Sequence, residues 1–442
     1  MISKLLFSRI DNSPLIIFRI FFGILISLES FGAILTGWVK RTLVDPDFTF
    51  SFIGFEWLQP LPGSGMYFYF ILMGLLGVSV ALGYRYRLSM IAFTLLWTGA
   101  YLMQKTAYNN HYYLLVLLSA IMCFMPANRA YSLDVRRKPS IRKGSMFALV
   151  KWVVVAQLLI VYTYAAIAKL YTDWLDFSII AQLMESRADY FLIGGLLQDP
   201  WVHKAIGIFG ILFDFSVVPL LLYRPTRKWA FAASVFFHLF NSLVFQIGIF
   251  PYLSLAFTVF FYEPETIRRI FFKKKPIPGP GTVSRPRYAQ ILLVGLGIYF
   301  LVQLVLPIRH HFIQGDVLWT EEGHRMSWRM MLRSRSGNLK FRVVDKETGA
   351  TEWIRLGDWL SDKQARKVQA YPDFIWQFAQ RLKNHYREKG QDIAVYVSGM
   401  ARVNRRHLAP LIDPETDLAS VPWDPFRHHE WILPSPYSKG QE

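Results

Sequence analysis

Cysteine is almost absent from this chain of 442 residues. The only cysteine, Cys123, lies inside an apolar run. A single cysteine cannot build an intrachain disulfide framework or a cysteine-based zinc site. Because a cysteine in apolar surroundings is usually inert, we do not expect thiol catalysis either.

Acidic residues are also scarce. The chain has 31 Asp and Glu against 49 Lys and Arg, which gives a formal net charge of +18. Such an excess is found in nucleic-acid-binding proteins, but here it is unevenly distributed. Residues 1–306 carry 28 basic and 14 acidic residues, whereas residues 307–442 carry 21 and 17. Most of the surplus lies in short connections between apolar segments, a pattern that indicates membrane topology and no nucleic-acid partner.

Apolar residues dominate what is present. Hydrophobic residues make up 53% of the chain and aromatic residues 16%, and the mean hydropathy is positive. Apolar segments long enough to cross about 30 Å of hydrocarbon recur along the sequence. We predict nine spans, near residues 14–37, 66–83, 89–104, 111–126, 147–169, 205–223, 229–247, 249–262 and 288–306. Residues 175–197 mix polar and apolar side chains and predict an interfacial helix.

The distribution of basic residues predicts the orientation. The N-terminus and alternate loops carry 20 Lys and Arg, and the opposite loops carry four. The positive-inside rule therefore predicts a multi-pass protein of the inner (cytoplasmic) membrane, with its N-terminus in the cytoplasm and its C-terminal part outside. In that part, residues 338–345 and 392–404 alternate like strands, residues 361–386 have helical periodicity, and residues 413–426 are typical of a loop.

The predicted fold class is thus a membrane all-α helical bundle of about eight or nine transmembrane helices, followed by an extramembrane α+β domain. The transmembrane domain, carrying the active site, is predicted to span residues 1–306. The extracytoplasmic domain is predicted to span residues 307–442.

Several polar residues lie at the outer ends of the predicted spans. Lys169 ends the fifth span within "YAAIAKLYTDWL", and Asn109, Asn110 and His111 begin the fourth. His238 and Asn241 are three residues apart on one helical face of the seventh. Because all of them fall on the side of the predicted external domain, this end of the bundle is the candidate site.

Each of these residues has a simpler structural interpretation as well. Lys169 could be an anchor that reaches water, although the alanines around it, with Tyr162 two turns earlier, favour a packed interior position. At least one asparagine is expected to cap the fourth span. His238 could be a buried histidine bonded to a backbone carbonyl.

A metal site is disfavoured. No two histidines have i,i+4 spacing, and we count no carboxylate beside them in the spans.

Further along the chain, Arg325, Arg329 and Arg333 are spaced by four. This spacing favours a solvated helix face over a site that attracts carboxylates.

Long motifs in the chain resemble the vitamin K-dependent gamma-carboxylases. The resemblance rests on "KTAYNNHYYLLVLLSAIMCFMPANRAYSLD", "AKLYTDWL" and "FHLFNSLVFQIGIFPYLSLAF". It continues in "QLVLPIRHHFIQGDVLWTEEGHRMSWRMMLRSRSG" and "DPFRHHEWILP", so it covers residues from about 14 to 434. Bacterial relatives of that family share the horizontally transferred transmembrane (HTTM) domain.

The resemblance implies a carbon–carbon lyase of the membrane, a peptidyl-glutamate carboxylase with two coupled reactions. Reduced vitamin K, as phylloquinol or menaquinol, is deprotonated and oxidised by O2 to the epoxide. The strong base formed on the way removes a γ-proton from glutamate in a peptide or protein, and CO2 adds to the carbanion. No metal takes part.

The resemblance also implies roles for individual residues. Lys169 matches the base that deprotonates the hydroquinone, His111 matches the histidine that assists it, and Asn110 lies close to the reacting site. His238 and Asn241 fall in the family's block that helps line the active cavity. We also predict that Tyr162, Asn109 and Trp174 bind cofactor or substrate.

The chain departs from the family pattern in two places. Vertebrate members carry a second lysine just before the matching base, where this chain has Ala168. The chain is also shorter at its C-terminus than vertebrate carboxylases, so we do not expect it to recognise a conventional propeptide on its substrate. The alternatives are a quinol epoxidase that does not carboxylate protein, and a non-catalytic membrane protein that binds a quinone or lipid.

Overall fold

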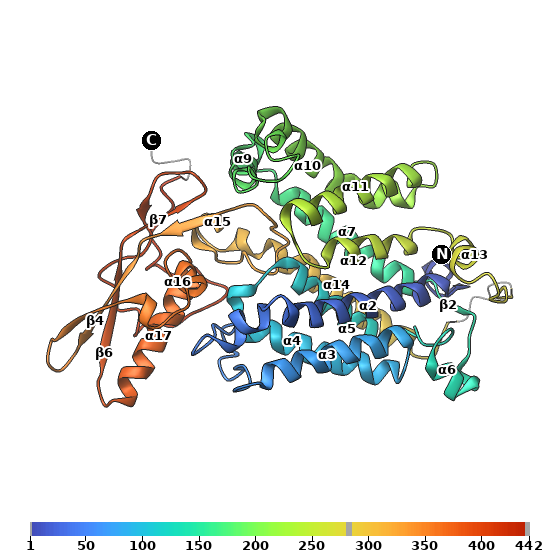
Figure 1. The fold of residues 1–442 in the computed structure, drawn as a ribbon, viewed down its shortest axis with the longest axis horizontal. Coiled ribbons are helices and arrows are strands. Elements are labelled where there is room, and N and C mark those ends of the chain that lie inside the picture. Colours follow the sequence, from blue (N-terminus) through green and yellow to red (C-terminus); the bar gives the residue numbers. More distant parts are fainter. Residues whose placement is uncertain (1, 280–284, 438–442) are drawn as a thin grey trace. The chain divides into compact units, whose positions relative to one another are not determined.

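The computed structural model describes residues 2–279 and 285–437, and Figure 1 shows the course of the chain. The chain divides into two compact units. The first unit comprises Met1–Asp45, Ser51–Ala166 and Gly210–Val302, and the second comprises Pro46–Phe50, Ile167–Phe209 and Gln303–Glu442. The division falls inside three helices, and the predicted domain boundary at residues 306 and 307 stays a prediction.

The first unit is helical. Its elements, including the three that continue past the division, are α1 (Ile2–Phe7), β1 (Arg9–Asp11), α2 (Ser13–Leu35), α3 (Gly65–Leu82), α4 (Tyr86–Met103), α5 (Asn110–Phe124), α6 (Leu133–Arg137), β2 (Ser145–Phe147), α7 (Leu149–Ala168), α10 (Pro200–Leu222), α11 (Arg227–Phe245), α12 (Phe250–Phe257), α13 (Pro264–Phe271) and α14 (Ala289–Ile308).

Six helices in the described part of the chain are long and apolar enough to cross a membrane: α2, α3, α7, α10, α11 and the stretch Ala289–Phe312 that begins with α14. The prediction of eight or nine spans is therefore wrong in number. The α5 helix has 15 residues and α12 has eight, so both are shorter than the hydrocarbon layer. The α4 helix has 18 residues but is interrupted by polar and aromatic side chains that lower its hydropathy.

Two of the spanning helices, α2 and α3, pack at close range because glycines lie at their contact (Figure 1). A Cβ on Gly23 would lie 2.3 Å from the backbone nitrogen of Ala81, and one on Gly77 would lie 2.7 Å from that of Ser27. The Ser27 hydroxyl donates a hydrogen bond of 3.0 Å to the Gly74 carbonyl. Small residues bring membrane helices together in this way.

The second unit combines strands and helices. Its elements are α8 (Thr172–Leu175), α9 (Ser178–Glu185), α15 (Val317–Thr320), β3 (Arg335–Gly337), β4 (Lys340–Asp345), β5 (Thr351–Ile354), α16 (Asp362–Val368), α17 (Pro372–Glu388), β6 (Ile393–Ser398), β7 (Met400–Val403) and β8 (Ala409–Pro410). They form two antiparallel three-stranded sheets, ordered β5–β4–β6 and β3–β7–β8.

The core of this unit lies where α17 packs on β6. Phe341 and Phe378 are fully buried and meet edge to face, with ring centroids 5.0 Å apart.

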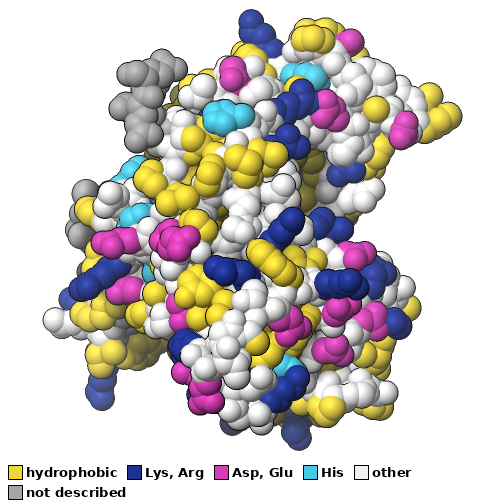
Figure 2. All heavy atoms as spheres, turned by 90° about the vertical axis from the view of Figure 1, so that its left-hand side faces the viewer, with side chains coloured by type: hydrophobic (Ala, Val, Ile, Leu, Met, Phe, Trp, Pro, Cys, Tyr) yellow, Lys and Arg dark blue, Asp and Glu magenta, His cyan; other side chains and the backbone are white. Residues whose placement is uncertain are grey.

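On the face drawn in Figure 2, basic and acidic side chains are interspersed among hydrophobic ones.

The expected pattern of the C-terminal region is largely confirmed. Strands form within residues 338–345 and 392–404, and residues 413–426 contain neither helix nor strand. The helical stretch 361–386 is split into α16 and α17, because Pro372 follows an extended Tyr371 and starts a new helix.

The single interfacial helix expected over residues 175–197 is wrong. Only Ser178–Glu185 is an α-helix beyond α8, and the remainder is turns and a short 3-10 helix. Phe177 interrupts the helical path with a φ of 65°, and Asp176 accepts a hydrogen bond of 2.9 Å from the Ser178 amide.

Candidate functional site

In the first unit, three helices bring two histidines to one phenylalanine. The His111 ring, in the first turn of α5, stacks on Phe250 at 3.9 Å between centroids with a 22° interplanar angle. His238 of α11 meets the same phenylalanine edge to face at 6.0 Å. The sequence prediction that His111 and His238 gather at one end of the bundle is thus matched by their shared contact with Phe250.

Local sequence fixes this arrangement. The Asn109 side chain accepts a hydrogen bond of 2.7 Å from the Tyr112 amide. Asn109 therefore caps α5, as expected of one of the two asparagines, and places His111 in the first turn. Between α11 and α12 the chain reverses through Gly248, which has a φ of 63°, and Pro251 lies in the first turn of α12. This tight reversal brings Phe250 back beside α11.

The His238 side chain is buried, with 1% of its surface exposed. Its Nε2 lies 3.0 Å from the Tyr162 hydroxyl on α7, so these two predicted binding residues are in direct contact. No described atom forms a hydrogen bond with its buried Nδ1. The sequence interpretation of a histidine bonded to a backbone carbonyl is therefore not what this geometry shows.

Two polar residues that the sequence analysis did not select lie beside Tyr162. Ser254 of α12 forms a hydrogen bond with its hydroxyl, and Asp214 of α10 interacts with it electrostatically. Asp214 is 5% exposed inside a candidate span. A carboxylate in such a position is itself a signal of function, which the sequence analysis overlooked when it counted none in the spans.

A second overlooked carboxylate, Glu29 of α2, supports the aromatic stack. The Tyr112 hydroxyl donates a hydrogen bond of 2.8 Å to Glu29, which also accepts one from the Ile249 amide. Tyr112 follows His111 and Ile249 precedes Phe250. Glu29 therefore ties together the two chain segments that carry the stacked rings.

Asn110 and Asn241, the other predicted residues of this unit, are placed as follows. Asn110 is 7% exposed and its Oδ1 accepts a hydrogen bond of 2.9 Å from the Tyr108 hydroxyl. Asn241 is half-buried on α11, three residues after His238. Their proposed roles stay predictions.

Lys169 and Trp174 belong to the second unit. Lys169 directly follows α7 and is 7% exposed. Its Nζ lies 5.2 Å from the centre of the Trp174 ring, within the range of a cation–π interaction. The Trp174 indole N–H in turn donates a hydrogen bond of 3.2 Å to the Gly207 carbonyl.

The segment after Lys169 is fastened by polar contacts within the same unit. Asp173, 6% exposed, accepts hydrogen bonds of 2.5 Å from both Asn404 and Arg406. The Tyr171 hydroxyl donates to the Leu332 carbonyl. These three contacts join the "LYTDWL" stretch to the C-terminal sequence, and no periodicity in the sequence predicts them.

The three arginines spaced by four do not form a helix face. Residues 325–333 lie in turns and irregular backbone. Arg325 pairs with Asp373 at 2.7 Å, and Arg333 pairs with buried Glu321. The preferred interpretation, a solvated helix face, is therefore wrong. Burial opposes the charge of Glu321, but Arg333 holds the pKa of this carboxyl well below its usual value.

The structure offers no group of three His, Cys, Asp or Glu residues that could hold a metal ion within residues 2–279 and 285–437.

Comparison with known families identifies the chain. The model of the HTTM domain matches residues 7–265, more than half of the sequence. The chain belongs to the HTTM family. Residues 288–438 of this HTTM protein match a second model, the lumenal domain of vitamin K-dependent gamma-carboxylase. No solved structure matches the chain.

These matches confirm the resemblance stated from the sequence motifs, and the chain is a gamma-carboxylase-like membrane protein. The His111, His238 and Phe250 cluster lies in the HTTM region. The Asp173 contacts join a residue of that region to residues 404 and 406 of the lumenal domain.

Proposed function

We propose that this HTTM protein is a vitamin K-dependent gamma-glutamyl carboxylase that couples epoxidation of a naphthohydroquinone to carboxylation of glutamate in a peptide or protein. The observation that carries the proposal is the presence of both family regions in one chain, in order and with a short connection. A protein that used only the membrane domain would not need the lumenal one.

The residues of the first unit suit a flat aromatic ring that carries oxygens. His111 and Phe250 present stacked rings, and the buried Nδ1 of His238 is a polar atom that a ligand oxygen would satisfy. When bound, reduced vitamin K would supply the electrons that turn O2 into a base strong enough to remove a γ-proton from glutamate.

The chain's own residues would hold and move protons around that chemistry. Lys169 is proposed to accept the hydroquinone proton, which an amine does only in its neutral form. His111 would assist, and Asn110 would orient the reacting groups. Tyr162 and its hydrogen bond to His238 would fix the imidazole tautomer. The phenylalanines around His238 would keep water away from a base that water would quench.

The proposed setting is a bacterial inner membrane, with the N-terminus in the cytoplasm and the carboxylase domain outside. Menaquinol is then the expected quinol. The glutamate substrate would come from the aqueous side, and CO2 and O2 are small enough to diffuse in.

One variant tests the catalytic proposal. Lys169→Ala should abolish formation of quinone epoxide from phylloquinol or menaquinol under O2, while the protein keeps its melting temperature. Lys151→Ala, which alters a half-buried lysine near the other end of α7, is the matched control and should retain epoxidation. Wild-type protein that makes no epoxide from either quinol would refute both enzyme functions and leave a non-catalytic quinone- or lipid-binding protein.

A second measurement separates carboxylation from epoxidation alone. Glutamate-containing secreted peptides, co-expressed with the wild type, should gain the mass of CO2 on glutamate, and those expressed with Lys169→Ala should not. Epoxide formation without any such gain would identify a quinol epoxidase.

A further inference from the structure

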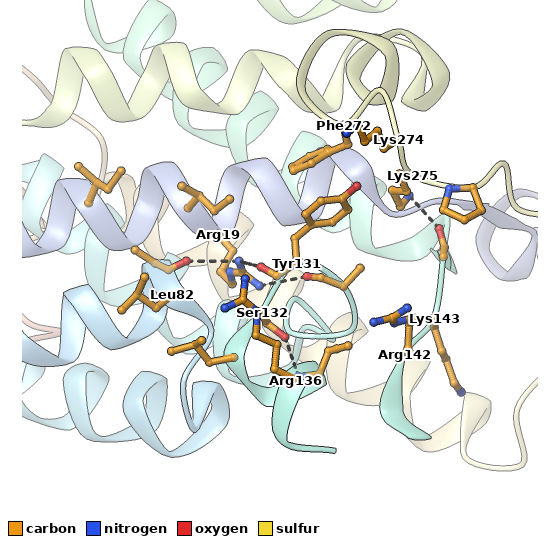
Figure 3. A pocket seen from close by; sticks show the side chains of 18 of the residues that line it. Arg19, Leu82, Tyr131, Ser132, Arg136, Arg142, Lys143, Phe272, Lys274 and Lys275 are labelled. Carbon is orange, nitrogen blue, oxygen red and sulfur yellow. Dashed lines mark hydrogen bonds between the residues drawn. The ribbon is translucent and has the colours of Figure 1, made fainter. Parts of the chain in front are cut away.

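The first unit contains a large cavity at the end where α6, β2 and α13 lie, drawn in Figure 3. Its volume is 1190 Å³. His111 lies in the first turn of α5, whereas Ala130 and Ser132, which line the cavity, follow the other end of that helix. The basic part of the cavity, next to Ala130 and Ser132, is thus about one length of α5 away from His111, whereas its apolar wall extends to Leu28, the neighbour of Glu29.

One wall of the cavity is apolar. It is formed by Ile24 and Leu28 of α2 with Val78 and Leu82 of α3. These four side chains are 40–59% exposed, although both helices are candidate membrane spans. Exposed aliphatic side chains on a spanning helix face hydrocarbon, so this wall is suited to an acyl chain.

The rest of the lining is strongly basic. Six Lys and Arg residues line the cavity, and none of its lining residues is Asp or Glu. Lys275 is neutralised by an ion pair with buried Asp11. The exposed Arg136, Arg142, Lys143 and Lys274 form no ion pair with any carboxylate in the described part of the chain, and Figure 3 shows them around the cavity with Arg19.

Arg19 adds a buried positive charge to the same cavity. It is 0% exposed, and its guanidinium donates to the carbonyls of Ala127 at 2.9 Å and Tyr131 at 2.7 Å. No described carboxylate forms an ion pair with it, and its Nε has no described hydrogen-bond partner. Asp134 acts on Arg19 electrostatically without an ion pair, and a buried cation held mainly by carbonyl groups favours a nearby anion.

We propose that this cavity binds an anionic glycerophospholipid, with its phosphate at Arg136, Arg142, Lys143 and Lys274 and an acyl chain along the wall of α2 and α3. A soluble phosphate compound would use the basic residues but not the apolar wall. A neutral lipid would use the wall but not the charges. The lipid that satisfies both carries a net negative head group, as phosphatidylglycerol does.

The head-group part is tested on the purified full-length protein in detergent. Native mass spectrometry measures the binding of phosphatidylglycerol and of phosphatidylcholine with identical acyl chains. Phosphatidylglycerol should bind more tightly. The double variant Arg142→Gln/Lys143→Gln should weaken that binding about 25-fold, from about 5-fold for each cation.

The matched control is Lys138→Gln/Lys273→Gln, which removes two exposed cations that do not line the cavity. It changes the net charge equally and should leave binding within about 2-fold of the wild type. Equal binding of the two lipids, or equal loss in the two double variants, would overturn the proposal in favour of unspecific attraction.

The wall is tested by Ile24→Trp, which places a large ring in the acyl groove and should displace the lipid while all the basic residues remain. Leu75→Trp, at an exposed position of α3 outside the cavity, is its control. Binding of glycerol phosphate as tight as that of phosphatidylglycerol, together with an unaffected Ile24→Trp variant, would show a soluble phosphate site and refute the lipid.

Discussion

Asp173 holds the segment that follows Lys169, and removing its carboxylate gives a sharp prediction. The side chain is 6% exposed and accepts two hydrogen bonds of 2.5 Å, from Asn404 and Arg406. Asp173→Ala leaves the amide of Asn404 and the guanidinium of Arg406 without this acceptor. We expect a less stable second unit and a displaced Lys169.

The magnitude follows from the burial of the partners. Removing one member of a fully buried ion pair costs about 3–5 kcal/mol. The Arg406 side chain is 27% exposed and can turn toward water, so we expect about 2–3 kcal/mol here. For a unit of this size, that loss lowers the melting temperature by about 5–10 °C.

The assay is thermal unfolding of the purified protein, followed by tryptophan fluorescence, together with epoxide formation at a temperature where the variant is folded. Asp189→Ala, which removes an exposed carboxylate of the same unit, is the control and should melt with the wild type. Arg406→Ala should cost less than Asp173→Ala, and the double variant should cost less than the sum. An Asp173→Ala variant that melts within about 1 °C of the wild type would refute the reasoning.

Three further predictions concern other contacts. Glu321→Gln should cost about 3–5 kcal/mol, because Arg333 loses its buried partner. Burial raises the pKa of Glu321, but Arg333 lowers it below the value in the unfolded chain. The ionised Glu321 therefore contributes its full stabilisation above the unfolded pKa of about 4.3, and this stabilisation is lost as the pH falls further. Melting temperatures between pH 3 and 7 should therefore drop on acidification more steeply for the wild type than for the glutamine variant. Gly23→Ala should cost about 1–3 kcal/mol, because the added methyl group meets the backbone of Ala81. Gly32→Ala is the control and should not destabilise the protein, because the space around Gly32 is open. Unchanged melting temperatures for both variants would contradict the close contact of α2 and α3. Tyr112→Phe removes a hydrogen bond to Glu29, so it should cost about 1–2 kcal/mol of stability and slow epoxide formation. Epoxide formation at the wild-type rate would show that the stacking of His111 on Phe250 does not depend on this hydrogen bond.

The sequence was sufficient for the features that arise from composition and long motifs. It predicted the membrane class, the strands of the C-terminal region, an asparagine cap at the start of the fourth predicted span and the family itself. It predicted too many spans for two reasons: α5 and α12 are short, and polar and aromatic side chains lower the hydropathy of α4.

The contacts of the site were less accessible from the sequence. The roles of Glu29 and Ser254 depend on which side chains meet across helices far apart in the chain, and no periodicity contains that information. The presence of Asp214 was a different kind of omission, since this carboxylate, like that of Glu29, is visible inside an apolar run of the sequence. The ion pairs of Arg325 and Arg333 were missed because a spacing of four was taken as helical where the chain forms turns.

The shortness of α5 has a consequence for how a lipid-soluble ligand reaches His111. Fifteen residues span about 22 Å, which is roughly 8 Å less than the hydrocarbon thickness. This hydrophobic mismatch requires the bilayer to thin beside α5 or the polar start of the helix to lie recessed below the membrane surface. In the second case Asn110 and His111 lie at the depth of the acyl chains. Under the proposed function, a prenylated quinol would therefore approach sideways from within the membrane and never need to enter water.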